Sequence, residues 1–460
     1  MKLILKTMKQ KRLNWIKQSV FYGMIGLLLA VSSCKEKDNT IETYQVKIKL
    51  VYPNNYQPKE GVAVKLENTA TNIIFEEPTD QNGVAQFEVV AGRYNVSASE
   101  SRSEELRAII FNGILANLVV SDSPAAEIEL PLSESETNQL VIKELYNGGC
   151  QKDDGSGAFQ NDSYVILYNN SSEPALLENV CLGIAMPFNA TGSNYDYIDG
   201  KLYYDAEGWI PAGQGMWTFQ QAVSLDPGKQ LVIALKNAVD NTQTYSQSIN
   251  FSNPEYYCTY DIAVYPNTSV YPAPSPAIPT NHYLKAYFYG TGNAWTISTT
   301  SPAFFIFATE GTTPETFAND ASLSDLYRGL AGQVRKKVPV GWVLDAIEVF
   351  QYGNASNQKR LPPTIDAGYI ELYNAQGFTL YRNVDKDATE AIPENAGKIV
   401  YNYSLGTQNI KIGDAVISGS TDPSGIDAEA SIKNGARVVY KDTNNSSNDF
   451  HQRIKASLRN

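Results

Sequence analysis

Two stretches of the sequence decide its fold: Leu140-Val141-Ile142-Lys143-Glu144-Leu145-Tyr146-Asn147-Gly148-Gly149 and Tyr164-Val165-Ile166-Leu167-Tyr168-Asn169. Each is rich in Leu, β-branched and aromatic residues and ends in an Asn or Gly turn, which is typical of a β-strand. Similar short runs, bounded by Gly, Pro, Asn and Asp, recur along the chain, and long helical periodicity is scarce. The sequence therefore predicts a mainly β protein with few helices, of which the segment 314–330 is the clearest candidate.

The charge balance excludes several classes of protein. The 460 residues include 37 Lys and Arg against 49 Asp and Glu, a formal net charge of −12. Proteins that bind nucleic acid need a basic surface to displace counterions from phosphates, so we expect no nucleic-acid partner. His282 and His451 are the only histidines, which excludes a multi-histidine metal site and leaves little room for histidine acid–base chemistry.

The N-terminus, residues 1–33, reads as a signal peptide. It contains six Lys and Arg and no acidic residue, and an apolar stretch from Val20 to Ala30 is too short for a permanent membrane helix. It leads into Leu29-Ala30-Val31-Ser32-Ser33-Cys34, which resembles a bacterial lipobox. That resemblance implies cleavage before Cys34 and covalent lipid on its sulfur. The alternative is an ordinary cleavable signal that ends near a cysteine.

Residues 34–42 read as a charged tether. Lys35-Glu36-Lys37-Asp38-Asn39 resembles the signal that sends lipoproteins of Bacteroidetes-type bacteria to the outer face of the outer membrane, although a solvated linker would have the same composition. We therefore expect an outer-membrane lipoprotein exposed on the cell surface. We expect the protein to be attached to the outer membrane through the lipid on Cys34, and we expect no cofactor besides this lipid.

Residues 43–136 are expected to form a β-sandwich. Val46, Ile48 and Leu50 alternate along one strand, and Thr79-Asp80-Gln81-Asn82-Gly83 marks a turn before the next. The order of strands, T-D-x-N-G turn and G-x-Y-x-V resembles the immunoglobulin/transthyretin-like sandwich of carboxypeptidase regulatory domains. The resemblance implies a spacer or interaction module rather than catalysis.

Residues 137–460 are expected to form a larger, loop-rich β domain, and a division near residue 335 stays open. The succession I-x-E-L-Y-N at Ile142 and Y-x-x-L-Y-N at Tyr164 resembles the lamin-tail immunoglobulin-like domain. Cys150 and Cys181 flank this strand unit and form the candidate disulfide in an oxidising compartment. The alternative is three buried thiols, Cys258 included.

The C-terminal region carries the most specific motif, Asp442-Thr443-Asn444-Asn445-Ser446-Ser447-Asn448-Asp449-Phe450. Together with Ile426–Gly435 it resembles the ending of a Bacteroidetes outer-membrane lipoprotein family of unknown function. The resemblance implies a neighbouring TonB-dependent receptor and assigns no catalytic residue.

The motif has two interpretations. Short oxygen-bearing side chains bond to nearby backbone amides and build compact turns. They also offer oxygens to sugar hydroxyls or to a hard cation. The candidate ligand contacts are Asp442, Thr443, Asn444, Asn445, Asn448 and Asp449. The sequence predicts no metal site. Calcium binding is an alternative that no motif in the sequence supports.

The leading hypothesis for function is a surface-anchored binding or accessory subunit of a TonB-dependent uptake system, with a glycan, peptide or other nutrient as ligand. The alternatives are an adhesin or structural surface protein and a glycoside hydrolase that uses two carboxylates. No recognised catalytic motif is present, so no enzymatic activity is expected. A set of aromatic residues offers either a contact platform or packing: Tyr195, Tyr197, Tyr203, Tyr204 and Trp209, with Tyr256 and Tyr257.

Overall fold

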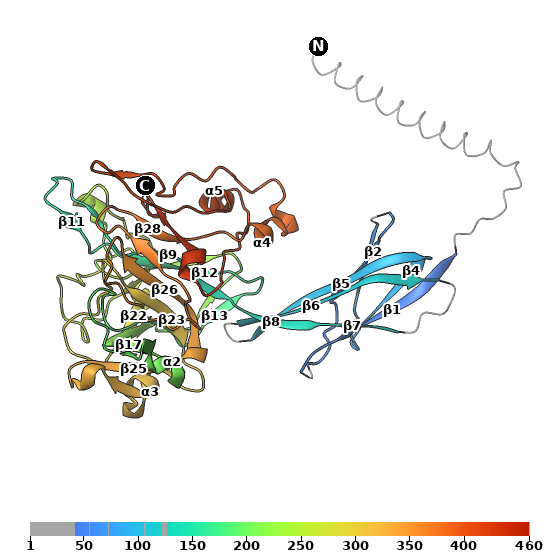
Figure 1. The fold of residues 1–460 in the computed structure, drawn as a ribbon, viewed down its shortest axis with the longest axis horizontal. Helices are drawn as coiled ribbons and strands as arrows, with labels where there is room; N and C mark the ends of the chain where they lie inside the picture. The colour runs from blue at the N-terminus through green and yellow to red at the C-terminus, as the bar shows by residue number, and fades with distance from the viewer. Residues whose placement is uncertain (1–41, 55, 72, 105–106, 122–126, 460) are drawn as a thin grey trace, which may run out of the picture. The chain divides into compact units, whose positions relative to one another are not determined.

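The computed structural model describes residues 42–54, 56–71, 73–104, 107–121 and 127–459 (Figure 1). The predicted signal peptide, Cys34 and all of the tether except Glu42 lie outside these residues. The described chain is mainly β with a few short helices, which confirms the predicted fold class. It falls into two compact units, residues up to 99 with 112–132, and residues 100–111 with 133–460. None of the helices described is long and apolar enough to cross a membrane.

The first unit is built from strands whose side chains alternate between core and solvent. Along β1, Val46, Ile48 and Leu50 are buried as the sequence pattern predicts. β1 pairs antiparallel with β4 and parallel with β7. One sheet has the order β4-β1-β7 and the other β3-β2-β5-β6-β8. The strands of these sheets are β1 (Thr43–Val51), β2 (Ala63–Asn68), β3 (Ile74–Pro78), β4 (Val84–Val90), β5 (Gly92–Glu104), β6 (Arg107–Val120), β7 (Ile128–Pro131) and β8 (Ser133–Asn138). Of these, β8, residues 100–104 of β5 and residues 107–111 of β6 fall in the residue range of the second unit.

The turn predicted at 79–83 is present. The Asp80 carboxylate accepts hydrogen bonds from the backbone N–H groups of Asn82 and Val84, both at 2.9 Å. Gly83 has a φ of 76°, a conformation that glycine adopts without a steric penalty. Asp80 therefore closes a turn.

A twelve-stranded sheet organises the second unit. Its order is β27-β26-β23-β14-β18-β22-β21-β20-β12-β9-β28-β31, and contacts of β26 with β9 and of β27 with β31 curl it into a nearly closed barrel. The strands are β9 (Leu140–Tyr146), β12 (Tyr164–Asn169), β14 (Val180–Ile184), β18 (Gly215–Thr218), β20 (Gln230–Ala234), β21 (Tyr257–Thr259), β22 (Tyr283–Phe288), β23 (Ala303–Ala308), β26 (Val343–Gln351), β27 (Ile370–Leu372), β28 (Thr379–Arg382) and β31 (Phe450–Arg453).

Shorter elements pack against the barrel. One three-stranded sheet has the order β17-β25-β24, with β17 (Trp209–Gly213), β25 (Val334–Pro339) and β24 (Ser324–Leu326). The two-stranded pairs are β10 (Cys150–Gln151) with β11 (Ala158–Phe159), β13 (Ala175–Leu177) with β19 (Val223–Leu225), β15 (Tyr197–Ile198) with β16 (Lys201–Leu202), and β29 (Lys411–Ile412) with β30 (Ala415–Val416).

The described helices are all short. The α-helices are α2 (Tyr203–Glu207), α3 (Pro314–Asn319), α4 (Lys386–Glu390), α5 (Ala428–Lys433) and α6 (Ser446–Asp449). The 3-10 helices are η1 (Asn241–Gln243), η2 (Thr280–His282), η3 (Ala321–Leu323), η4 (Tyr327–Gly329), η5 (Val340–Trp342) and η6 (Pro393–Asn395).

The helix predicted over 314–330 is wrong beyond its first turns. α3 ends at Asn319, and the Asp320 carboxylate then accepts the Ser322 N–H at 2.9 Å to start η3. The following residues form β24, and Arg328 has a φ of 56°. A local side-chain cap and a left-handed residue thus override the apolar spacing.

The barrel strands are buried on both faces. Ile142, Leu167 and Phe304 belong to the largest apolar cluster, whereas Val141, Tyr168 and Phe305 belong to smaller clusters. Every second residue therefore joins the main core, and its neighbour packs against the covering elements. This is why Leu140–Ile142 and Tyr164–Tyr168 read as continuous apolar runs.

A bulge in β9 breaks this alternation. Ile166 and Leu167 of β12 oppose Glu144 and Ile142, so Lys143 is the extra residue. The buried Lys143 ammonium donates to Gln230 Oε1 at 2.6 Å and pairs with Glu429 at 2.7 Å. The bulge thereby lets one apolar strand carry a cation.

A buried ion pair bridges the seam between β26 and β9. Asp345 Oδ2 accepts the Ile142 N–H at 2.6 Å, and the Arg382 guanidinium of β28 bonds both Asp345 and, at 2.7 Å, the Ile142 carbonyl. Arg382 is fully buried and Asp345 is nearly so. Because no backbone ladder joins β9 to β26, these side chains supply the hydrogen bonds of the seam.

We predict that Arg382→Met lowers the free energy of unfolding by about 3–5 kcal/mol, because it leaves the Asp345 carboxylate buried without its cation. Urea unfolding of the detergent-solubilised full-length protein measures the change. Lys386→Met, at an exposed lysine, is the matched control and is expected to change little. The double variant Asp345→Leu/Arg382→Met should be more stable than Arg382→Met alone, and equal or lower stability would contradict an electrostatic seam.

Candidate functional site

The C-terminal motif folds into a loop and α6 that lead into β31. Asp449 is 2% exposed, and its carboxylate accepts the backbone N–H groups of Thr443 at 2.9 Å and Asn445 at 3.2 Å, and the Thr443 hydroxyl at 2.7 Å. The Asn445 side chain caps α6 by accepting the Ser447 N–H at 3.0 Å. Asp449 and Asn445 therefore hold the loop in shape.

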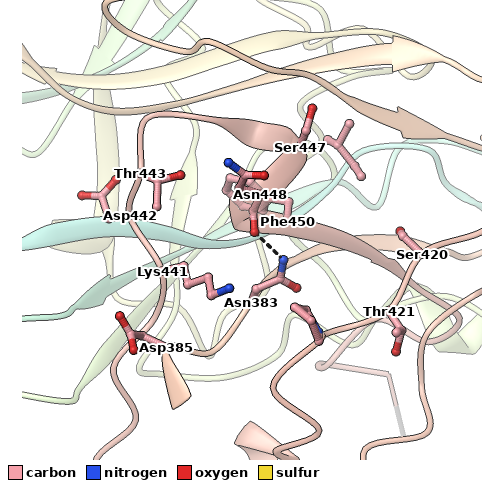
Figure 2. Close-up of a pocket in the computed structure, with 12 residues that line it drawn as sticks. Asn383, Asp385, Ser420, Thr421, Lys441, Asp442, Thr443, Ser447, Asn448 and Phe450 are labelled. Carbon is pink, nitrogen blue, oxygen red and sulfur yellow. Dashed lines mark hydrogen bonds between the residues drawn. The ribbon is translucent and has the colours of Figure 1, made fainter. Parts of the chain in front are cut away.

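The outer side of this loop forms one wall of a cleft with a volume of about 470 Å³ (Figure 2). Of the six residues predicted as ligand contacts, Asp442, Thr443 and Asn448 line the cleft. Asn444, Asn445 and Asp449 are not among the lining residues. The lining residues are Ile370, Asn383, Asp385, Ser420, Thr421, Pro423, Lys441, Asp442, Thr443, Ser447, Asn448 and Phe450.

Sequence reasoning missed most of the opposite side of the cleft. Asn383 and Asp385 follow β28, and Ser420 and Thr421 come from a loop, so their neighbours in sequence give no sign of a shared site. Lys441 could have been included from the sequence, because it directly precedes the motif. Figure 2 shows its side chain running toward Asn383, with Asp442 and Thr443 on one side and Ser420 and Thr421 on the other.

The backbone of Lys441 is held by hydrogen bonds, whereas its ammonium group has no partner among the described residues. Its N–H donates to the Asn383 carbonyl at 2.9 Å, and its own carbonyl accepts Arg382 Nη1 at 2.7 Å. Among the described residues, no hydrogen-bond or ion-pair partner lies on the ammonium itself. Asp385 is similar, because one carboxylate oxygen caps α4 through the Ala388 N–H at 3.0 Å and the second oxygen has no partner in the described part of the chain.

Arg382 supports the cleft wall from behind. Besides closing the seam, its Nη1 lies 3.6 Å from Asp442 Oδ1 and 3.9 Å from Asp449 Oδ2, and its guanidinium stacks 4.4 Å from the centre of the Phe450 ring. Burial raises the pKa of Asp442. The Asp449 carboxylate raises this pKa further, and the Arg382 guanidinium lowers it. The seam and the cleft wall thus share one cation.

His451 holds the other wall. The Asn383 amide donates to the Asn448 carbonyl at 2.7 Å, so its oxygen faces His451 Nδ1, 2.8 Å away, and that nitrogen donates. The other ring nitrogen then accepts from the Tyr403 hydroxyl. This arrangement requires a neutral ring, and burial lowers the pKa of His451 to about 3, with Arg453 contributing. The histidine is therefore a positioning group behind Asn383.

The predicted disulfide between Cys150 and Cys181 is wrong, because both are buried free thiols, as is Cys258. Cys181 lies on β14, and Cys150 follows β9 in the chain. Two strands, β26 and β23, separate β9 from β14 on the side of the barrel where these two strands are nearer to each other. At about 4.8 Å per strand the two are too far apart for the Cα separation of about 7 Å that a bridge allows. Burial raises the pKa of both thiols to about 12.

The predicted aromatic platform is mostly packing. Tyr204 and Trp209 are buried against each other with ring centres 5.2 Å apart, and Tyr197 and Tyr203 pack beside them. Tyr195 alone of this set is exposed, at 57%. Nor do the described residues contain a cluster of His, Cys, Asp and Glu side chains able to hold a metal ion.

Part of the chain is similar to a family of unknown function. Residues 226–404 match the family described as "Protein of unknown function (DUF4876)". A solved DUF4876 family protein from Bacteroides thetaiotaomicron VPI-5482 has a TM-score of 0.58 at 20% identity, with 91% of this chain and 97% of that chain covered. This likeness shows a shared fold.

Two further comparisons give no information about the fold or function of this chain. A structure of BcpA, the major pilin subunit of Bacillus cereus, aligns with 73% of this chain and 99% of its own at 9% identity, but the TM-score is 0.15. No functionally curated protein matches the chain.

We predict that His451 makes stability fall in mild acid. An unfolded His takes up a proton near pH 6.5, whereas the folded one does so only near pH 3, so its contribution is complete above pH 6.5 and is lost as the pH falls. Between pH 6.5 and 5 the loss is about 2 kcal/mol. Urea unfolding at both pH values should show this loss in the wild type and a smaller one in His451→Gln, whose amide can still donate and accept. Parallel pH profiles would show that His451 titrates normally in the folded protein.

Proposed function

We propose that the protein is a surface-exposed outer-membrane lipoprotein, anchored through Cys34, that acts as a binding or accessory subunit of a TonB-dependent nutrient-uptake system. The observation that carries the proposal is the polar cleft beside the C-terminal motif. The Lys441 ammonium and one Asp385 oxygen face it without partners in the described chain, while Arg382 and His451 fix its walls. The lipobox-like sequence at Cys34 supports the anchor.

The arrangement of groups favours binding over catalysis. His451 is buried and neutral behind Asn383, and the three thiols have raised pKa values. The carboxylate of Asp449 holds backbone amides, and Asp345 pairs with Arg382. The groups most suited to chemistry are therefore committed to structure.

A fixed wall also favours affinity. The motif loop is tied to β26 because the Ser446 N–H donates to Asp366 Oδ1 at 2.8 Å while Asp366 Oδ2 accepts the Glu348 N–H at 2.9 Å. Side chains held in place before binding lose little freedom when a ligand arrives, and more of the contact energy remains as affinity.

The anchor is tested by fractionating cells that express the full chain. We expect wild type in the outer membrane and open to a membrane-impermeant label, and Cys34→Ala released from it, because the acyl chains supply the attachment. Cys150→Ala, the same change at a buried thiol, should fractionate like wild type. Retention of Cys34→Ala in the membrane, or protection of the body from added protease, would contradict surface anchoring.

The accessory role is tested by purifying the tagged full chain from detergent-solubilised outer membranes. A TonB-dependent receptor is expected to co-purify with the wild-type protein. Its absence would contradict the accessory role, and sustained hydrolysis of polysaccharides or peptides by the purified chain would contradict a role in binding alone.

A further inference from the structure

We propose that the cleft binds a neutral, polyhydroxylated ligand, a sugar, with Lys441 donating to its hydroxyls and Asp385 and Asp442 accepting from them. This inference rests on the proposed function and gives its ligand a chemical class. The lining of the cleft is a mixture of cationic, anionic, neutral polar and apolar groups (Figure 2).

The polar groups of the lining include strong donors and strong acceptors side by side. Lys441 can only donate, the carboxylates of Asp385 and Asp442 can only accept, and the Asn448 amide and Thr421 hydroxyl do both. A sugar hydroxyl donates and accepts at a single oxygen. Neighbouring hydroxyls on one ring therefore match a lining in which donors and acceptors are intermixed.

The charges argue against an ionic ligand. The lining contains one cation, Lys441, and two carboxylates, Asp385 and Asp442, of which Asp442 also faces the buried Arg382. An anion drawn to Lys441 would meet the carboxylates, and a cation drawn to them would meet Lys441. A neutral ligand avoids both costs and still gains charge-assisted hydrogen bonds.

The apolar part of the lining suits the carbon face of a sugar. Ile370, Pro423 and Phe450 contribute apolar surface, and the volume of about 470 Å³ lies within the range of small-molecule sites. Next to Ile370, Tyr369 is 44% exposed and stacks on Phe350 with ring centres 4.1 Å apart.

The backbone of Tyr369 is held by the cleft wall. Its N–H donates to the Ser447 hydroxyl oxygen at 3.1 Å, and that hydroxyl donates to the Tyr369 carbonyl at 2.7 Å. Tyr369 itself is not among the lining residues, so its part in the wall is to hold Ser447 through its backbone.

The test is saturation-transfer NMR on the detergent-solubilised full-length protein with D-glucose, D-galactose, D-mannose, D-xylose and N-acetyl-D-glucosamine. At least one sugar is expected to show transfer, and Lys441→Met and Asp385→Asn should each weaken its affinity about tenfold by removing a charge-assisted bond. Asparagine still caps a helix, so Asp385→Asn preserves α4. Tyr369→Ala should weaken binding by less than either of these two variants.

Matched controls lie on α4, close in sequence but outside the lining. Lys386→Met and Asp387→Asn remove the same charges at exposed positions and should leave binding unchanged. Glycylglycine and calcium chloride, titrated by calorimetry, probe the zwitterionic and cationic alternatives.

Three results would overturn the sugar assignment: transfer from none of the sugars, binding of glycylglycine or calcium in their place, or sugar affinity unchanged in both Lys441→Met and Asp385→Asn. If a receptor still co-purifies in those cases, the accessory role stands and only the ligand class is wrong. Sugar binding without a receptor would remove the accessory role and keep the ligand class.

Discussion

Arg382 brings a charged guanidinium into the barrel wall, and both the closure of the barrel and the shape of the cleft depend on how that charge is satisfied. Burial of an unpaired cation costs several kcal/mol, so the group must find partners in every direction. It finds Asp345 across the seam and the Ile142 carbonyl on the neighbouring strand β9. In the cleft wall it finds the Lys441 carbonyl and Asp442. The Phe450 ring covers one face of its guanidinium.

The cleft is a consequence of this closure. Once β28 and β31 pair beside β9, the segments that follow β28 and precede β31 are brought against one another. Asn383 and Asp385 come from the first of these segments, and Lys441 and the motif come from the second. Asp449 and His451 then use their polar atoms to fix the two walls, which leaves Lys441 and one oxygen of Asp385 available. Within the motif, Asp449 and Asn445 thus hold the loop in shape, whereas Asp442 and Asn448 line the cleft.

The mainly β fold could be predicted from the sequence because strand periodicity is a local property, visible in β1 and in the two deciding stretches. The bulge at Lys143 was not predictable, since an extra residue in a strand is defined only by the strand it pairs with. The same limit applies to the thiols, because sequence proximity of Cys150 and Cys181 hides the strands between them. The motif pointed toward one wall of the cleft, since half of its candidate contacts lie there. Asp385 and Thr421 join the cleft only through tertiary closure, and no nearby residues mark them.

Hydrogen exchange on Arg382→Met, read by mass spectrometry, tests most directly whether one cation holds both features. If Arg382 holds both features, peptides covering β9 and peptides covering residues 441–450 lose protection together, while peptides covering β1 in the first unit exchange as in wild type. Loss of protection in only one of the two segments would contradict a shared cation, because the seam and the cleft wall would then be held independently.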